Sequence, residues 1–205
     1  MVVFAAACAP EVQRATVSAP VATNDAKPIV TASSKRYAFR SPHARVHVVA
    51  NDMLNGDDHM DFEAVRGTMR MDPATGRGRL HVEVEMSRFK ANHGAVYEVA
   101  SEMIEAWEHP RAEIDAALEP IEGQPDKRLV TGNLRLHGIE RGIRFVADVT
   151  TWEGGGVRLR ASFDLARSAF AMHARPDSGE RLVRDDFTVT FDFRAGPERV
   201  TVETD

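Results

Sequence analysis

Apolar residues occupy every second position in six separate runs of this sequence. The runs cover residues 80–86, 112–118, 130–136, 143–149, 157–165 and 187–193. A period of two places one face of each strand against an apolar interior and the other face in water. Many such strands with almost no helix between them must close on themselves or pair into a sandwich. The alternation therefore predicts an all-β protein whose antiparallel strands surround an apolar interior.

Shorter runs extend this pattern toward the N-terminus. Alternation at residues 36–39 and 46–50 predicts two more strands. Residues 60–71 alternate in two phases, and the shift by one residue predicts a β-bulge within a single strand. Taken together, the runs predict an eight-stranded antiparallel barrel. Such a barrel has an interior just wide enough for side chains or for one small ligand.

Residues 95–107 carry a helical pattern, with apolar residues at the spacing i, i+3, i+4 and i+7. The residues on this apolar face are Val96, Val99, Ala100, Met103, Ile104 and Trp107. His109-Pro110 ends the segment, because proline cannot continue a helix. We expect one short α-helix that covers an end of the barrel, either as a lid or as a structural cap.

The N-terminal segment resembles a truncated lipoprotein signal. Residues 1–8 place an apolar run and small residues directly before Cys8, the only cysteine of the sequence. This arrangement is similar to a bacterial lipobox, in which the cysteine becomes the lipidated first residue; the alternative is a frayed N-terminus with an incidental cysteine. Residues 9–34 are rich in Ala, Pro, Ser, Thr and Val and predict a flexible tether. The folded domain is then expected over residues 35–205.

Charge and motifs argue against several classes of function. The net charge of −5, with basic residues scattered along the chain, gives no support to nucleic-acid binding. The eight histidines form no H-x-H or H-E-x-x-H pattern, so no metal site is predicted. The sequence also lacks the G-x-S-x-G, phosphate-loop and dinucleotide motifs. We therefore expect a protein that is not an enzyme and needs no obligatory cofactor.

Three stretches together resemble the YceI-like family. They are Gly132 to Ile139 (GNLRLHGI) followed by Ile143-Arg144-Phe145, Phe163 to Phe170 (FDLARSAF), and Val96 to Ile114 with its helix and His109-Pro110. Their order and spacing match over residues 36–194. The resemblance implies an extended lipocalin-like barrel that binds, sequesters or transports a polyisoprenoid, an isoprenoid quinone or another amphiphilic lipid. It also implies a periplasmic or envelope location, where a lipidated Cys8 would give membrane association; a protein partner is not identified.

The candidate ligand contacts are inward apolar positions of the predicted strands, where a lipid tail would lie. They are Val82, Val84, Ile114, Leu134, Leu136, Phe145, Val149, Leu159, Phe163 and Phe191. Arg167 falls on the same inward phase, and it would either contact the polar head of the ligand or form an ion pair with Asp185 or Asp186. Two other interpretations stay open. One is a structural or interaction lipoprotein whose phenylalanines fill the core, and the other is a cavity enzyme such as an isomerase, cyclase or hydrolase.

Overall fold

The computed structural model describes residues 13–20, 34–52, 56–173 and 183–196. Within these ranges, thirteen strands form one sheet, accompanied by an α-helix and a short 3-10 helix. In chain order the elements are β1 (Gln13–Arg14), β2 (Thr16–Ser18), β3 (Lys35–Arg40), β4 (Ala44–Asp52), β5 (Gly56–Phe62), β6 (Val65–Met71), β7 (Gly78–Glu85), β8 (Phe89–Ala91), α1 (Gly94–Ile104), β9 (Arg111–Ile121), β10 (Gln124–Leu136), β11 (Ile139–Thr151), β12 (Val157–Ala166), the 3-10 helix η1 (Arg167–Phe170) and β13 (Val183–Ala195).

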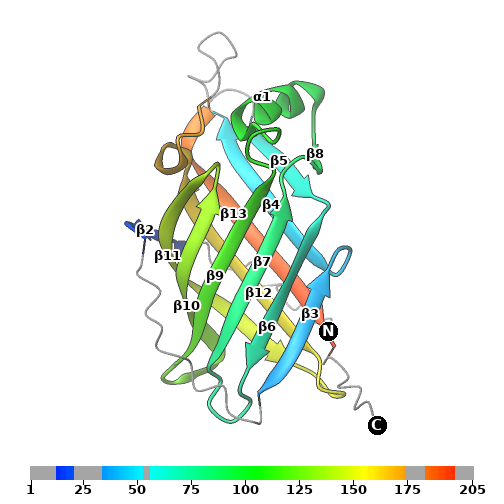
Figure 1. Ribbon diagram of the computed structural model, residues 1–205, viewed down its shortest axis with the longest axis vertical. Helices are drawn as coiled ribbons and strands as arrows, with labels where there is room; N and C mark the ends of the chain where they lie inside the picture. Colours follow the sequence, from blue (N-terminus) through cyan, green and yellow to red (C-terminus); the bar gives the residue numbers. More distant parts are fainter. Residues whose placement is uncertain (1–12, 21–33, 53–55, 174–182, 197–205) are drawn as a thin grey trace, which may run out of the picture.

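The sheet curls around an apolar interior into a barrel-like shape, with α1 at one end (Figure 1). The main path of the sheet is β3-β6-β7-β9-β10-β11-β12-β13-β4-β5-β8. Strands β9 to β13 follow one another as antiparallel neighbours, and β4 then pairs with β13. The predicted all-β architecture is confirmed, and its strands pair antiparallel as predicted except that β1 lies parallel to β12. The prediction of eight strands is wrong, because thirteen strands lie within the described residues and several of them are too short to show alternation.

The phase shift within residues 60–71 marks a change of strand and not a β-bulge. β5 pairs with β4 and β8, whereas β6 pairs with β3 and β7. The chain turns between Phe62 and Val65, and both of these residues point into the interior. A turn that sends the chain to a different part of the sheet resets the alternation, which the sequence pattern alone does not distinguish from a bulge.

The N-terminal segment forms part of the sheet. Among the described residues, β11 and β12 pair from Asp148↔Arg160 to Thr151↔Val157 and then diverge. β1 pairs in parallel with β12 and β2 pairs antiparallel with β11, so residues 13–18 fill the gap between these two strands. The predicted flexible tether over residues 9–34 is therefore wrong for residues 13–18. These strands are held by backbone pairing and are too short to show a period, and Cys8 lies outside the described residues.

Helix α1 begins close to its predicted start and ends earlier than predicted. Glu105 adopts a left-handed conformation with φ 46°, and its N–H donates to the Ser101 carbonyl. The helix therefore stops at Ile104, and Trp107, which the pattern placed on the apolar face, is 70% exposed. No helix in the described ranges combines the length and the apolar character needed to cross a membrane.

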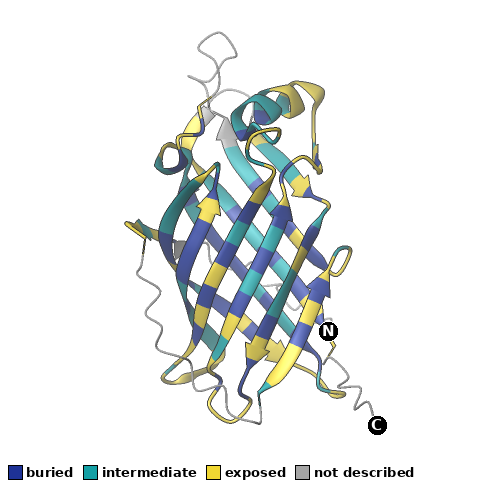
Figure 2. Ribbon diagram, in the orientation of Figure 1, coloured by how far each residue is buried: buried dark blue, intermediate teal, exposed yellow. Residues whose placement is uncertain are grey.

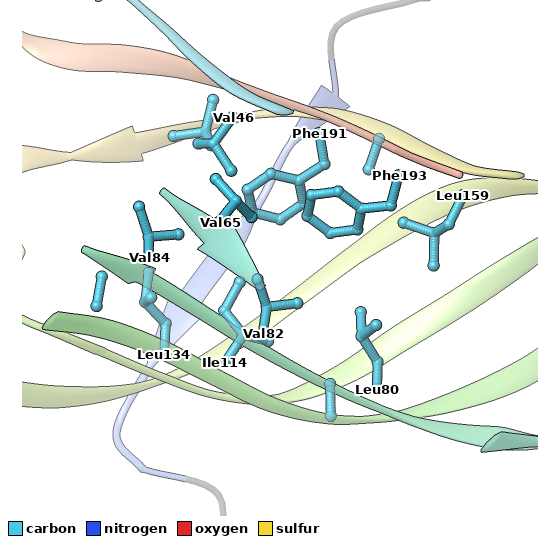
Figure 3. Close-up of a cluster of buried hydrophobic side chains, with 14 of the residues drawn as sticks. Val46, Val65, Leu80, Val82, Val84, Ile114, Leu134, Leu159, Phe191 and Phe193 are labelled. Carbon is cyan, nitrogen blue, oxygen red and sulfur yellow. The ribbon is translucent and has the colours of Figure 1, made fainter. Parts of the chain in front are cut away.

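The apolar stripes of the strands meet in the interior of the curled sheet. Buried and exposed residues alternate along the strands, as Figure 2 shows. Side chains from opposite walls point toward one another, among them Val46, Val82, Ile114, Leu134 and Phe191 (Figure 3). The predicted inward face of each long strand is confirmed. Side chains fill one part of this interior, and another part is hollow.

Candidate ligand-binding cavity

An apolar cavity of about 440 Å³ lies within the sheet, and α1 forms part of its wall. Strands β4, β5, β7, β9, β10, β12 and β13 supply most of the rest of the wall, mainly with Val, Leu, Ile, Ala, Met and Phe side chains. Pockets for small molecules have volumes of about 300–1,000 Å³ and are lined mainly by apolar groups. In both size and chemistry, this cavity is suited to an apolar ligand.

Eight of the predicted contact residues lie on the cavity wall. They are Val82, Val84, Ile114, Leu134, Leu136, Phe163, Arg167 and Phe191. Phe145, Val149 and Leu159 are also buried, but they do not belong to the described wall. Alternation identifies which face of a strand points inward, but it does not show at which level along the barrel a residue lies. The three residues consequently pack in the filled part of the interior.

Four phenylalanines pack together where the cavity meets the filled part of the interior, and we call them the aromatic floor. The Phe145 and Phe163 rings stack with centroids 4.2 Å apart, and Phe191 contacts Phe163 edge-on at 5.3 Å. Phe193 stacks on Phe191 at 5.3 Å. Phe163 and Phe191 face the cavity, whereas Phe145 and Phe193 lie behind them. The aromatic floor therefore ends the cavity on a rigid apolar surface.

Helix α1 covers the cavity with its apolar face. Val96, Val99, Ala100, Met103 and Ile104 line the cavity, so the apolar stripe predicted for this helix is confirmed up to Ile104. The ring of Tyr97 stacks on Phe89 of β8 with centroids 4.9 Å apart, which ties the helix to the sheet. Because its apolar face borders the cavity, α1 covers a space as well as side chains.

Polar groups on the cavity wall are few. They are Asp58 on β5, His93 just before α1, Arg167 at the start of η1 and Arg184 on β13. Two of the four are guanidinium groups, which favour a ligand whose polar end is anionic or rich in oxygen. A largely apolar wall with a small polar set is the usual arrangement for binding an amphiphile.

Asp185 on β13 holds the short helix η1 in place. Its carboxylate accepts hydrogen bonds from the Ser168 backbone N–H at 2.9 Å and from the Ser168 Oγ at 2.6 Å. Burial acts to raise the pKa of Asp185, but these hydrogen bonds, together with the charges of Arg167 and His173, outweigh burial and lower the pKa. Arg167 donates from Nη1 to the Met172 carbonyl at 3.4 Å. Asp185 is one of the two carboxylates predicted to pair with Arg167, and the charge of Arg167 contributes to its lowered pKa.

Replacing Asp185 by asparagine is expected to lower the free energy of unfolding by about 0.5–1 kcal/mol at neutral pH, because an exposed charge-assisted hydrogen bond is lost. A carboxylate whose folded-state pKa lies below its ordinary value of 3.8 stabilises the fold above that value, and it loses this contribution as the pH falls through the folded-state pKa. Urea denaturation of both proteins across this pH range measures the effect. A difference in the free energy of unfolding between the two proteins that grows as the pH falls would contradict this role of Asp185.

Several cavity residues were missed by reasoning from the sequence. They belong to β4, β5 and β13 and include Val46, Val48, Met60, Phe62 and Val189. Alternation at residues 46–50 and 187–193 carried the necessary signal. Their closeness to β7 and β10 depends on β4 pairing with β13, and no local pattern shows this long-range contact.

A curled, mostly antiparallel sheet that encloses an apolar cavity under a helix defines a lipocalin-like type of barrel. The family model that matches this chain is the YceI-like domain, over residues 37–195. The chain belongs to the YceI-like family. The matched residues include the whole cavity wall, whereas β1, β2 and the first two residues of β3 precede the match.

Solved structures share the fold at low sequence identity. Burkholderia cenocepacia BcnA is 20% identical with a TM-score of 0.66, and the alignment covers 74% of this chain and 96% of that chain. A polyisoprenoid binding domain from Saccharophagus degradans is 10% identical with a TM-score of 0.60, with 78% of this chain and 98% of that chain covered. No curated protein matches the chain.

Proposed function

We propose that this protein binds an amphiphilic lipid, such as a polyisoprenoid, an isoprenoid quinone or a fatty compound, and sequesters or transports it with the tail in the cavity. The observation that carries the proposal is the apolar cavity of about 440 Å³ between the aromatic floor and α1. Burying a tail there contributes about 0.8 kcal/mol for each methylene-sized group. The polyisoprenoid binding domain from Saccharophagus degradans, which shares this fold, supports this class of ligand.

The volume of the cavity limits how much of the tail is enclosed. An apolar cavity of about 150 Å³ admits one benzene molecule, so about 440 Å³ accommodates on the order of eighteen carbon atoms. A tail of this size fits completely. A much longer polyisoprenoid would require the cavity to expand or would extend past α1, so lipids with tails of about this size are the favoured ligands.

The polar head is expected to lie toward Arg167 and Arg184. Both residues belong to the small polar set of the wall, and a guanidinium group binds phosphate, carboxylate or quinone oxygens well. The wall residues show no nucleophile paired with a general base among the described side chains. These features support a binding protein rather than an enzyme.

An envelope location is part of the same proposal. It is supported by the similarity of residues 1–8 to a lipobox, in which Cys8 would carry the lipid. The folded barrel would then act close to a membrane, where amphiphiles are exchanged.

The proposal is tested by producing the full-length chain in a bacterial host, purifying it without detergent and analysing its organic extract by lipid mass spectrometry. We expect about one amphiphile per protein. A well-folded protein that carries no lipid, and takes up none from isoprenoid or fatty-acid mixtures, would contradict lipid binding. Digestion of the same preparation reports on Cys8: an acylated Cys8 peptide supports the envelope location, and an unmodified one contradicts it.

A further inference from the structure

A second group of ionisable side chains lies beyond the C-terminus of α1, and none of them lines the cavity. Glu105 follows the last residue of α1, His109 precedes β9, and His137 lies in the turn between β10 and β11. One carboxylate oxygen and one ring nitrogen from each histidine lie within 4.8 Å of one another. His137 is far from the other two in sequence, so spacing motifs gave no sign of this cluster.

The backbone brings Glu105 and His109 together. The Glu105 carbonyl accepts hydrogen bonds from the N–H groups of Glu108 and His109, each at 2.9 Å. Gly138 gives the His109 ring the space it needs, since a Cβ at this glycine would lie 3.0 Å from His109 Cε1. The His109 and His137 rings are 4.3 Å apart between centroids. The three side chains are thus placed by a closed turn and by close packing.

The hydrogen bonds of His137 leave its Nε2 directed at a carboxylate. Nδ1 lies 3.1 Å from the Phe170 carbonyl, which can only accept, so Nδ1 carries the proton. In the neutral ring, Nε2 then carries a lone pair instead of a hydrogen. This atom lies 3.0 Å from a Glu105 carboxylate oxygen. Two acceptors at this distance repel each other unless a cation lies between them, either a second proton on Nε2 or a metal ion. The side chain of His137 is only 10% exposed, whereas that of Glu105 is 40% exposed, so an ion between them would be reached by water from the Glu105 side.

We propose that Glu105, His109 and His137 form a binding site for a divalent transition-metal ion of the zinc type. Two imidazole nitrogens with one carboxylate oxygen are a known ligand set for Zn²⁺, with water completing the coordination. A ligating histidine usually donates its other N–H to a carbonyl or carboxylate, as His137 does to Phe170. The nitrogen ligands favour such ions over Ca²⁺ and Mg²⁺. An ion here would fasten the end of α1 to the β10–β11 turn.

The test uses the full-length protein after treatment with a chelator, titrated with Co²⁺ and followed by visible absorption, with Zn²⁺ as competitor. We expect one equivalent of Co²⁺ to bind and one equivalent of Zn²⁺ to displace it. Glu105→Gln is the most informative variant, because a glutamine amide donates a hydrogen bond to the neutral His137 ring and preserves the packing. We expect it to weaken binding at least about tenfold, and His109→Ala to do the same.

His59→Ala is the matched control. His59 lies next to His47, with 3.3 Å between Nδ1 and Nε2, but its nitrogens do not converge with a carboxylate. This variant should keep stoichiometric metal binding. The proposal is overturned if the unmodified protein binds no stoichiometric Co²⁺ or Zn²⁺, if Glu105→Gln binds as tightly as the parent, or if His59→Ala abolishes binding instead. The parent titration needs no variant to fold, so the test does not depend on variant stability.

Discussion

Replacing Phe163 by alanine is expected to lower the free energy of unfolding by about 3–5 kcal/mol. Phe163 has no exposed surface and stacks on Phe145 with ring centroids 4.2 Å apart. It also supports Phe191 edge-on, so its removal opens the middle of the aromatic floor. The space left behind joins the existing cavity, and rigid neighbouring rings cannot collapse into it. Urea denaturation followed by circular dichroism measures the loss.

Trp107→Ala is the control for this experiment. Trp107 is a large aromatic residue too, but it is 70% exposed and lies beyond the end of α1. Its removal should change the free energy of unfolding by no more than about 0.5 kcal/mol. Equal losses in the two variants would show that Phe163 does not anchor the core.

Filling the cavity is expected to abolish lipid retention without unfolding the protein. Ala100 on α1 and Ala112 on β9 both line the cavity, and changing both to phenylalanine adds two rings to it. Two benzene-sized groups occupy about 300 of the roughly 440 Å³, which leaves less space than one further ring requires. A tail deprived of about twelve buried carbons loses roughly 10 kcal/mol of binding free energy. Lipid mass spectrometry of the extracted variant should detect no stoichiometric ligand.

The fold of the filled variant can be checked independently, because filling a cavity typically raises the free energy of unfolding by about 0.5–2 kcal/mol. The matched control changes Ala38 and Ala117 to phenylalanine; both alanines are exposed and lie on strands of the same sheet. This control should retain its lipid. Full lipid content in the folded Ala100→Phe, Ala112→Phe protein would place the ligand elsewhere.

Much of the fold could be predicted because it depends on local periodicity. The stripes at residues 80–86 and 157–165 have a period of two, and each residue of a stripe meets the interior in the structure. Strand number could not be predicted in this way. β8 has three residues and β2 has three, so neither shows a repeat, and the turn between β5 and β6 imitates a bulge.

Only part of the candidate site could be predicted, because local periodicity shows which residues point inward but not where they lie along the barrel. Val84, Ile114 and Leu134 lie on the cavity wall because the inward phase of their strands is correct. Phe145 and Leu159 share that phase, yet they lie in the filled part of the interior and not on the cavity wall. The level of a residue along the barrel depends on how neighbouring strands are staggered, and the sequence pattern does not contain this stagger. The approach of Glu105 to His137 depends on long-range pairing in the same way.

The pairing of β1 with β12 also sets how far the barrel could stand from a membrane. If Cys8 carries the proposed lipid, the connection to the barrel runs from Cys8 to Gln13 and not as far as residue 34. Five residue steps of an extended chain span at most about 18 Å. The anchor would then hold the side of the barrel between β11 and β12 near the lipid headgroups.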